Sequence, residues 1–136
     1  MVLQVRFSLP RYKRGFHIIT SVINDKMPLL PETGLVNIFI HHTSAALAIN
    51  ENADPTVRYD FESFMNKLVP ENDPLYMHIF EGADDMPAHL KSSILGQSLT
   101  IPVTSGRMSL GRWQGIYLCE FRNHGGGREI SITVTS

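Results

Sequence analysis

The stretch Val36–Asp54, VNIFIHHTSAALAINENAD, constrains this chain more than any other. Apolar residues dominate both sets of alternating positions over residues 36–42, which predicts a strand that is buried on both faces and ends in imidazoles. Residues 43–48 are nearly all small, so a ligand or another backbone can approach closely, and Asn50 and Glu51 follow. Two interpretations fit this pattern: a binding site at the end of a strand, or a core strand followed by a polar turn.

Length and composition favour one domain that spans residues 1–136. Charge is balanced, with 12 Lys and Arg against 13 Asp and Glu, and this argues against a dedicated nucleic-acid-binding protein. The single cysteine, Cys119, has no partner for an internal disulfide and lies in an apolar run, which indicates a core position in a reducing compartment. No apolar stretch reaches 18 residues and no signal peptide is apparent, so we expect a cytoplasmic protein that does not bind membranes.

Periodicity and turn residues predict an α+β domain with a mostly antiparallel or mixed sheet and two or three helices. The expected strands cover residues 2–8, 16–19, 36–42, 99–103, 113–122 and 130–134. The expected helices cover residues 20–27, 54–68 and 86–95. Pro102 indicates an edge strand or a bulge, and Gly125–Gly127 is interpreted as a hairpin turn between the last two strands.

The helix over residues 54–68 begins at Asp54-Pro55, a capping carboxylate followed by proline at the first helical position. Its apolar positions recur every three or four residues, and Asp60 is expected on the same side. A carboxylate that faces a core is costly unless it is paired, so Asp60 has either a cationic partner or a functional role.

Three of the six histidines lie beside polar or acidic residues at the ends of expected elements: His42, His78 and His89. Three imidazoles with one open position suit catalytic Zn²⁺, and imidazole can also act as a general acid or base without a metal. Glu51, Asp60 and Asp85 are candidates to orient these rings, since Asp85 precedes His89 by one helical turn.

Positive charge for an anionic substrate is expected from Arg107, which follows a glycine turn. The alternative is a solvated arginine. Asp84 and Asp85 offer carboxylates that could cap the third helix or hold a metal.

Three segments carry a resemblance to a known family: HHTSAALAINENADPTVRYDF, EGADDMPAHLKSSILG and SLTIPVTSGRMSLGRWQGI. They resemble the YjbQ family, also called the secondary thiamine-phosphate synthase family. The resemblance covers nearly the whole chain, and it implies a compact α+β domain that assembles as a homotrimer. Trp113 matches the family pattern, whereas Arg112 stands where a small Ser or Thr is expected.

The resemblance also implies a polar pocket and its residues. The expected catalytic residues are His42, His78, His89, Glu51 and Asp60. The expected substrate-binding residues are Thr43, Asn50, Asp85, Arg107 and Gln114. The expected ligands for a divalent metal, zinc or magnesium, are His42, His78 and His89.

The activity implied by the resemblance is weak thiamine-phosphate synthesis, in which a thiazole phosphate displaces pyrophosphate from an aminopyrimidine diphosphate. Two alternatives remain open from the residues. One is a metal-dependent hydrolase of a small phosphorylated metabolite, because histidines prefer Zn²⁺ to Mg²⁺. The other is a non-catalytic trimer that binds a small anion or metabolite.

Overall fold

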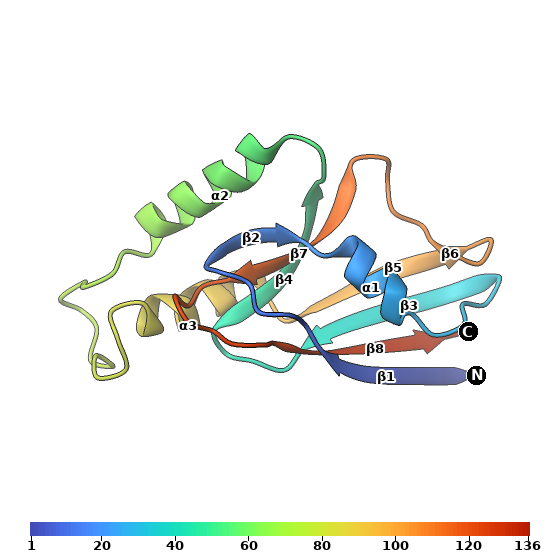
Figure 1. The fold of residues 1–136 in the computed structure, drawn as a ribbon, viewed down its shortest axis with the longest axis horizontal. Coiled ribbons are helices and arrows are strands. Elements are labelled where there is room, and N and C mark those ends of the chain that lie inside the picture. Colours follow the sequence, from blue (N-terminus) through green and yellow to red (C-terminus); the bar gives the residue numbers. More distant parts are fainter.

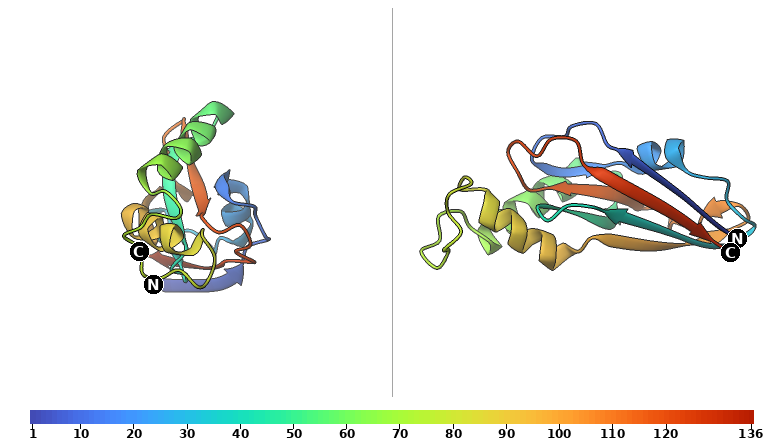
Figure 2. Two further views of the ribbon diagram at one scale, coloured as in Figure 1. Left: turned by 90° about the vertical axis from the view of Figure 1, so that its left-hand side faces the viewer. Right: turned by 90° about the horizontal axis from the view of Figure 1, so that it is seen from below.

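The computed structural model describes all residues 1–136 and contains two antiparallel sheets, with two helices at one end of the second sheet (Figure 1). The first sheet has the order β1-β8-β3-β5-β6 and the second has the order β2-β7-β4. The molecule is elongated, and both termini lie at the end opposite helices α2 and α3 (Figure 2). The expected α+β class with mostly antiparallel strands is confirmed.

The strands of the first sheet are β1 (Val2–Ser8), β3 (Thr33–Ile40), β5 (Ser98–Thr104), β6 (Arg107–Met108) and β8 (Glu129–Thr135). The strands of the second sheet are β2 (Gly15–Ile18), β4 (Ala45–Glu51) and β7 (Gln114–Glu120). The helices are α1 (Thr20–Lys26), α2 (Pro55–Leu68) and α3 (Asp85–Leu95). No helix is long and apolar enough to cross a membrane.

Strand β7 lies at the centre of the layered structure, and both of its faces are buried. Ile116 and Leu118 join the core between the two sheets. Tyr117 and Cys119 point the other way, into a second core shared with α2 and α3. The alternation of a strand makes this possible, because neighbouring side chains project to opposite faces. Cys119 is therefore the expected core residue, and its burial raises the pKa of the thiol.

The structure of residues 36–54 differs from the expectation in two ways. Strand β3 ends at Ile40, and only one of its faces is buried, because Phe39 on the other face is 40% exposed. The small residues after it form a second strand, β4, which the sequence does not predict. Alanine has little intrinsic preference for strands, so the pairing of β4 with β7 overrides local propensity.

The glycine-rich segment Gly125–Gly127 is not a hairpin turn, because β7 and β8 belong to different sheets. The segment carries the chain from one sheet to the other. Gly125 packs against Glu120: a Cβ atom at this position would lie 2.2 Å from the carboxylate oxygen Oε1. Strand order depends on long-range pairing, which periodicity alone does not reveal.

The two longer helices form where expected. Helix α2 begins with Asp54, whose side chain accepts from the N–H of Thr56, and its one buried residue is Met65, while Phe64 is 63% exposed. Asp60 is exposed and does not face a core, so its expected orientation is wrong. Phe61 packs against the second core, whereas Phe64 and Leu68 are more than half exposed.

Helix α3 ends at Gly96, whose φ of 101° is the backbone conformation that glycine adopts most easily. Its buried side includes Ala88, Lys91 and Ser92, whereas Ile94 is 56% exposed. Burial lowers the pKa of Lys91, and its ammonium group donates to Asn66 Oδ1 at 2.7 Å.

A buried ion pair joins the end of β7 to the start of β8. Arg128 Nε donates to Glu120 Oε1 at 2.7 Å, Nη2 contacts Oε2 at 2.5 Å, and Nη2 also donates to the main-chain oxygen of Ser44 at 3.2 Å. The Arg128 side chain is 5% exposed and that of Glu120 is 0% exposed, so each buried charge needs the other to offset its loss of solvation.

We expect Arg128→Met to lower the free energy of unfolding by about 3–5 kcal/mol, because it leaves the Glu120 carboxylate buried without a partner. The double variant Glu120→Met/Arg128→Met should recover most of this loss. Urea unfolding of the three proteins measures both effects. A double variant as unstable as Arg128→Met would show that lost packing, and not the unpaired charge, causes the change.

Candidate metal centre

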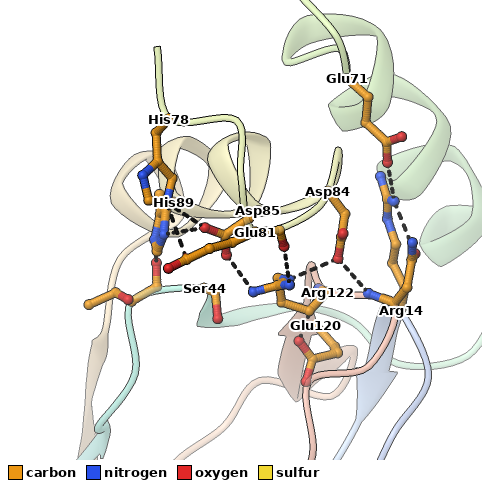
Figure 3. A network of polar contacts seen from close by, with 12 residues as sticks. Arg14, Ser44, Glu71, His78, Glu81, Asp84, Asp85, His89, Glu120 and Arg122 are labelled. Atoms are coloured by element: carbon orange, nitrogen blue, oxygen red, sulfur yellow. Dashed lines mark hydrogen bonds and ion pairs between the residues drawn. The ribbon is translucent and has the colours of Figure 1, made fainter. Parts of the chain in front are cut away.

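Four side chains with metal-binding atoms converge where the 69–84 loop meets α3: His78, Glu81, Asp85 and His89 (Figure 3). Their ligand atoms all lie within 4.8 Å of one another. His78 and Glu81 come from the loop, and Asp85 and His89 lie one turn apart on α3. This spacing puts the last two side chains on the same face of the helix.

Asp85 is the centre of the cluster. Its Oδ2 atom lies 2.7 Å from His78 Nε2 and 3.1 Å from His89 Nε2. Glu81 Oε2 approaches His78 Nε2 at 3.2 Å. The Asp85 side chain is only 2% exposed, whereas those of His78 and Glu81 are 47% and 63% exposed. The buried carboxylate of Asp85 therefore faces imidazole and carboxylate groups that are accessible to solvent.

The tautomer of His89 follows from its second contact. His89 Nδ1 lies 2.9 Å from the main-chain oxygen of Thr43, which can only accept, so Nδ1 carries a proton and donates. In the neutral ring, Nε2 then presents its lone pair to the Asp85 oxygen, and two acceptors repel. The contact becomes favourable if the ring is an imidazolium or if a cation lies between the two atoms. Metal-binding histidines commonly have the second arrangement, with the other ring nitrogen donating to an oxygen.

Arg122 donates hydrogen bonds to two acidic residues, Asp84 and Asp85. Its Nη1 group donates to Asp85 Oδ1, and its Nε donates to Asp84 Oδ2 at 2.8 Å. The N–H of Asn123 also donates to Asp84 Oδ2, at 2.9 Å. Asp84 therefore does not cap α3 with its side chain. It ties the start of the helix to the segment after β7.

Ionisation in the cluster follows from these contacts. Hydrogen bonding to Asp85, with a smaller contribution from Glu81, raises the pKa of His78. Burial alone would raise the pKa of Asp85, but the hydrogen bond to His78 and the charges of His89 and Arg122 outweigh it and lower that pKa. The centre thus keeps a charged carboxylate at neutral pH.

The donor set fits a zinc-type ion. Ligands at about 2.0–2.1 Å in tetrahedral geometry lie about 3.3 Å from one another. The distances from His89 Nε2 to Asp85 Oδ2 and from His78 Nε2 to Glu81 Oε2 are 3.1 and 3.2 Å, close to this value. His78 Nε2 and Asp85 Oδ2 are closer, at 2.7 Å, and all the ligand atoms lie within 4.8 Å of one another, so the side chains would have to adjust around an ion. Two imidazoles with carboxylates favour Zn²⁺ over Mg²⁺, which prefers oxygen ligands and water.

A hollow of about 510 Å³ opens beside His78. Residues of the 72–83 loop line most of it, and Tyr76 and Met86 contribute larger side chains. This volume is within the range of small-molecule sites, so a compact substrate has room next to the cluster.

Of the residues expected at the site from sequence, the structure brings together His78, His89, Asp85 and the main chain of Thr43. His42 is not part of the cluster. Its Nε2 accepts from the N–H of Glu129 at 2.8 Å, which occupies the nitrogen that a metal would need.

The expected residues Asn50, Glu51 and Gln114 form a separate group at the far end of β4. Strand β4 spans about 20 Å, and Thr43 lies just before its opposite end. The Glu51 carboxylate accepts from the N–H groups of Ala53 and Asp54 before α2, and Gln114 Oε1 accepts from the N–H of Gly111. These side chains stabilise turns within the chain.

Arg107 lies on β6, at the end of the molecule opposite α3 (Figure 1). It borders a hollow of about 480 Å³ whose other walls include Leu30 and Met108. Asp60 is exposed on α2. Within one chain, neither residue joins the histidine cluster.

Sequence reasoning missed Glu81 as a candidate ligand, and it missed the contacts of Arg122 with the cluster. Glu81 follows His78 by three residues, and Asp85 and His89 follow at two further steps of four. A search restricted to pairs of histidines overlooks this run of alternating ligand types. Arg122 has no local pattern, because it lies 37 residues after Asp85.

His42 gives a testable dependence of stability on pH. Burial, together with the charge of Arg128, lowers the pKa of its imidazole below 6.5, so the folded protein holds the ring neutral. The unfolded chain binds the proton more readily, so this contribution to stability is complete above about pH 6.5 and is lost as the pH falls towards the folded pKa. We expect His42→Gln, which keeps an acceptor for Glu129 but cannot titrate, to lose less stability than wild type between pH 7.5 and 5.5 in urea unfolding. Parallel losses in both proteins would contradict the assignment.

Comparisons with known proteins place this chain in a family. The profile described as "UPF0047 protein YjbQ-like" matches residues 5–136. The "UPF0047 protein YjbQ" of Salmonella typhimurium LT2 is 54% identical over 136 residues, with 98% of each chain covered. The protein of the same name from Escherichia coli O157:H7 is 48% identical over the same length and coverage.

Solved structures agree with the fold. A conserved hypothetical protein from Thermus thermophilus superposes with a TM-score of 0.82 at 38% identity, covering 94% of this chain and 97% of that chain. A protein of unknown function from Sulfolobus solfataricus gives a TM-score of 0.84 at 22% identity, covering 98% and 96%, and so supports the fold alone. By sequence and by fold, the chain belongs to the YjbQ/UPF0047 family.

Proposed function

We propose that this protein is a divalent-metal enzyme that acts on a small phosphorylated compound at the cluster of His78, Glu81, Asp85 and His89. The contact between His89 and Asp85 carries the proposal. In the neutral ring the proton is on His89 Nδ1 and is committed to Thr43, so Nε2 and the buried carboxylate then face each other as two electron-pair donors. A cation between them turns a repulsive contact into two metal–ligand bonds.

The surrounding residues suit this role. Arg122 keeps Asp85 in place, the Thr43 carbonyl fixes the His89 ring, and the hollow beside His78 leaves one side of the centre open for a substrate. A bound Zn²⁺ would supply Lewis-acid polarisation of a phosphoryl oxygen and would activate water near neutral pH. Glu81, with an exposed carboxylate beside the centre, is suited either to bind the metal or to accept a proton.

Thiamine-phosphate synthesis is the first reaction to test, because the family resemblance implies it. That reaction needs positive charge where pyrophosphate leaves. Within the chain, the nearby Arg122 is already engaged with Asp84 and Asp85, so the metal itself would carry this role. Metal-dependent hydrolysis of a small phosphorylated metabolite is the second candidate, favoured by the two imidazole ligands.

We expect purified wild-type protein to bind one Zn²⁺ per chain and His89→Ala to bind it at least about tenfold more weakly, since one imidazole ligand is lost. Affinity should fall as the pH falls below the raised pKa of His78, because protons compete with the metal for the ring. Competition titration with a chromogenic chelator measures both effects. His124→Ala, which removes an exposed histidine outside the cluster, is the matched control.

Turnover tests the enzymatic part of the proposal. Zn²⁺-loaded and Mg²⁺-loaded wild type are assayed with the thiazole phosphate and the aminopyrimidine diphosphate, and then with a panel of phosphorylated metabolites. We expect metal-dependent turnover that His89→Ala abolishes, with little change in the melting temperature of the metal-free protein. Metal binding without any turnover would instead favour a binding protein.

A homotrimer is the second part of the proposal, following the family resemblance. Several large apolar side chains support a partner surface, because α2 and the following loop leave them more than half exposed: Phe64, Leu68, Leu75, Met77 and Phe80. A second copy of the chain is the expected partner.

Multi-angle light scattering at micromolar concentration should give three times the chain mass of 15.3 kDa. Phe80→Glu should lower this mass, because it places a charge on a side chain that is 94% exposed in the single chain. A wild-type mass equal to one chain would refute the assembly.

A further inference from the structure

Arg122 contacts two residues of the candidate metal centre, Asp85 and Glu81, and also Asp84 beside them, although it is not one of the four ligand residues (Figure 3). Its Nη1 group donates to Asp85 Oδ1 and its Nε donates to Asp84 Oδ2. Its Nη2 group donates to the main-chain oxygen of Glu81 at 3.0 Å. One guanidinium thus connects the end of the loop, the start of α3 and the chain that follows β7.

We propose that Arg122 is the positioning residue of the metal centre, which fixes Asp85 as a one-oxygen ligand and holds the Glu81 segment beside it. The inference rests on the proposed function, since it assigns a role in metal binding. It adds a determinant of affinity from a distant part of the chain.

The first support is that the two oxygens of the Asp85 carboxylate have different partners. Oδ1 is occupied by Arg122, whereas Oδ2 lies near both imidazole nitrogens. A free carboxylate could rotate or bind a metal through both oxygens. The guanidinium leaves one oxygen for the cation and prevents rotation about the last bond of the side chain.

Burial is the second support. The Asp85 side chain is 2% exposed, and the Asp84 and Arg122 side chains are 10% and 26% exposed. Two adjacent carboxylates repel each other in such surroundings unless a cation lies between them. Arg122 therefore keeps the ligand charged and in place before any metal arrives.

The geometry of the guanidinium is the third support. Three different nitrogen atoms of one planar side chain donate to three acceptors within residues 81–85: the main-chain oxygen of Glu81 and the carboxylates of Asp84 and Asp85. A lysine ammonium is a point charge on a flexible stem and does not reproduce this fixed arrangement. The loop contact matters because the side chains around Glu81 make few other anchoring contacts: Phe80 is 94% exposed and Ile79 is 59% exposed.

The test measures Zn²⁺ affinity of full-length wild type, Arg122→Met, Arg122→Lys and Asp84→Asn by chelator competition, with Co²⁺ absorption spectra as a report of ligand geometry. Arg122→Met should weaken Zn²⁺ binding by about 10- to 100-fold and alter the Co²⁺ spectrum, as loss of a group that orients a ligand does. Arg122→Lys should fall between Arg122→Met and wild type. Asp84→Asn removes the negative charge of one Arg122 partner but keeps the contacts with Asp85 and Glu81, so it should bind within about threefold of wild type.

Each result has a separate meaning. Wild-type protein without Zn²⁺ binding overturns the proposed function and, with it, this inference. Zn²⁺ binding by wild type with equal affinity in Arg122→Met or in Arg122→Lys overturns the positioning role alone. An equal loss in Asp84→Asn and Arg122→Met would show that Arg122 acts through the general stability of this region. If Arg122→Met does not fold, the comparison of Arg122→Lys with Asp84→Asn decides the question.

Discussion

The buried carboxylate of Asp85 is the interaction on which the functional end of this protein depends. One oxygen is held by Arg122 and the other meets both His78 and His89. A carboxylate in this position is stable only while cations or donors surround it. Asp85 therefore connects the loop, helix α3 and the segment after β7, and a metal ion would add to the partners that already surround its carboxylate.

The layered fold explains how these parts meet. Strand β7 is buried on both faces, and one face supplies Tyr117 and Cys119 to the core that supports α2 and α3. The chain leaves β7 at Glu120, and two residues later Arg122 lies beneath the start of α3. The ion pair between Glu120 and Arg128 then joins the two ends of the segment that connects β7 to β8 in the other sheet. The same strand thus anchors the core and delivers the arginine that supports the candidate metal centre.

The candidate site was only partly predictable from sequence. Asp85 and His89 are four residues apart on a helix, so their contact follows from helical geometry. The position of His78 beside them depends on the path of a long loop, and that of Arg122 on the packing of β7. His42 is of a residue type that commonly binds metals, but its Nε2 atom accepts a hydrogen bond from the main-chain N–H of Glu129. Residue type alone does not distinguish a ligand from a histidine that satisfies a backbone group.

The sequence by itself determined the family, the α+β class and the local elements with strong terminal residues, such as the start of α2 at Asp54-Pro55 and the end of α3 before Gly96. Capping groups, proline and glycine act on the backbone over a few residues, so their effects can be predicted from the local sequence. Only the tertiary structure decided that β7 and β8 belong to different sheets, that residues 45–51 form a strand, and that Arg107 lies far from the histidines. These outcomes depend on which distant surfaces bury one another, a balance of packing and pairing over the whole molecule that no local pattern contains.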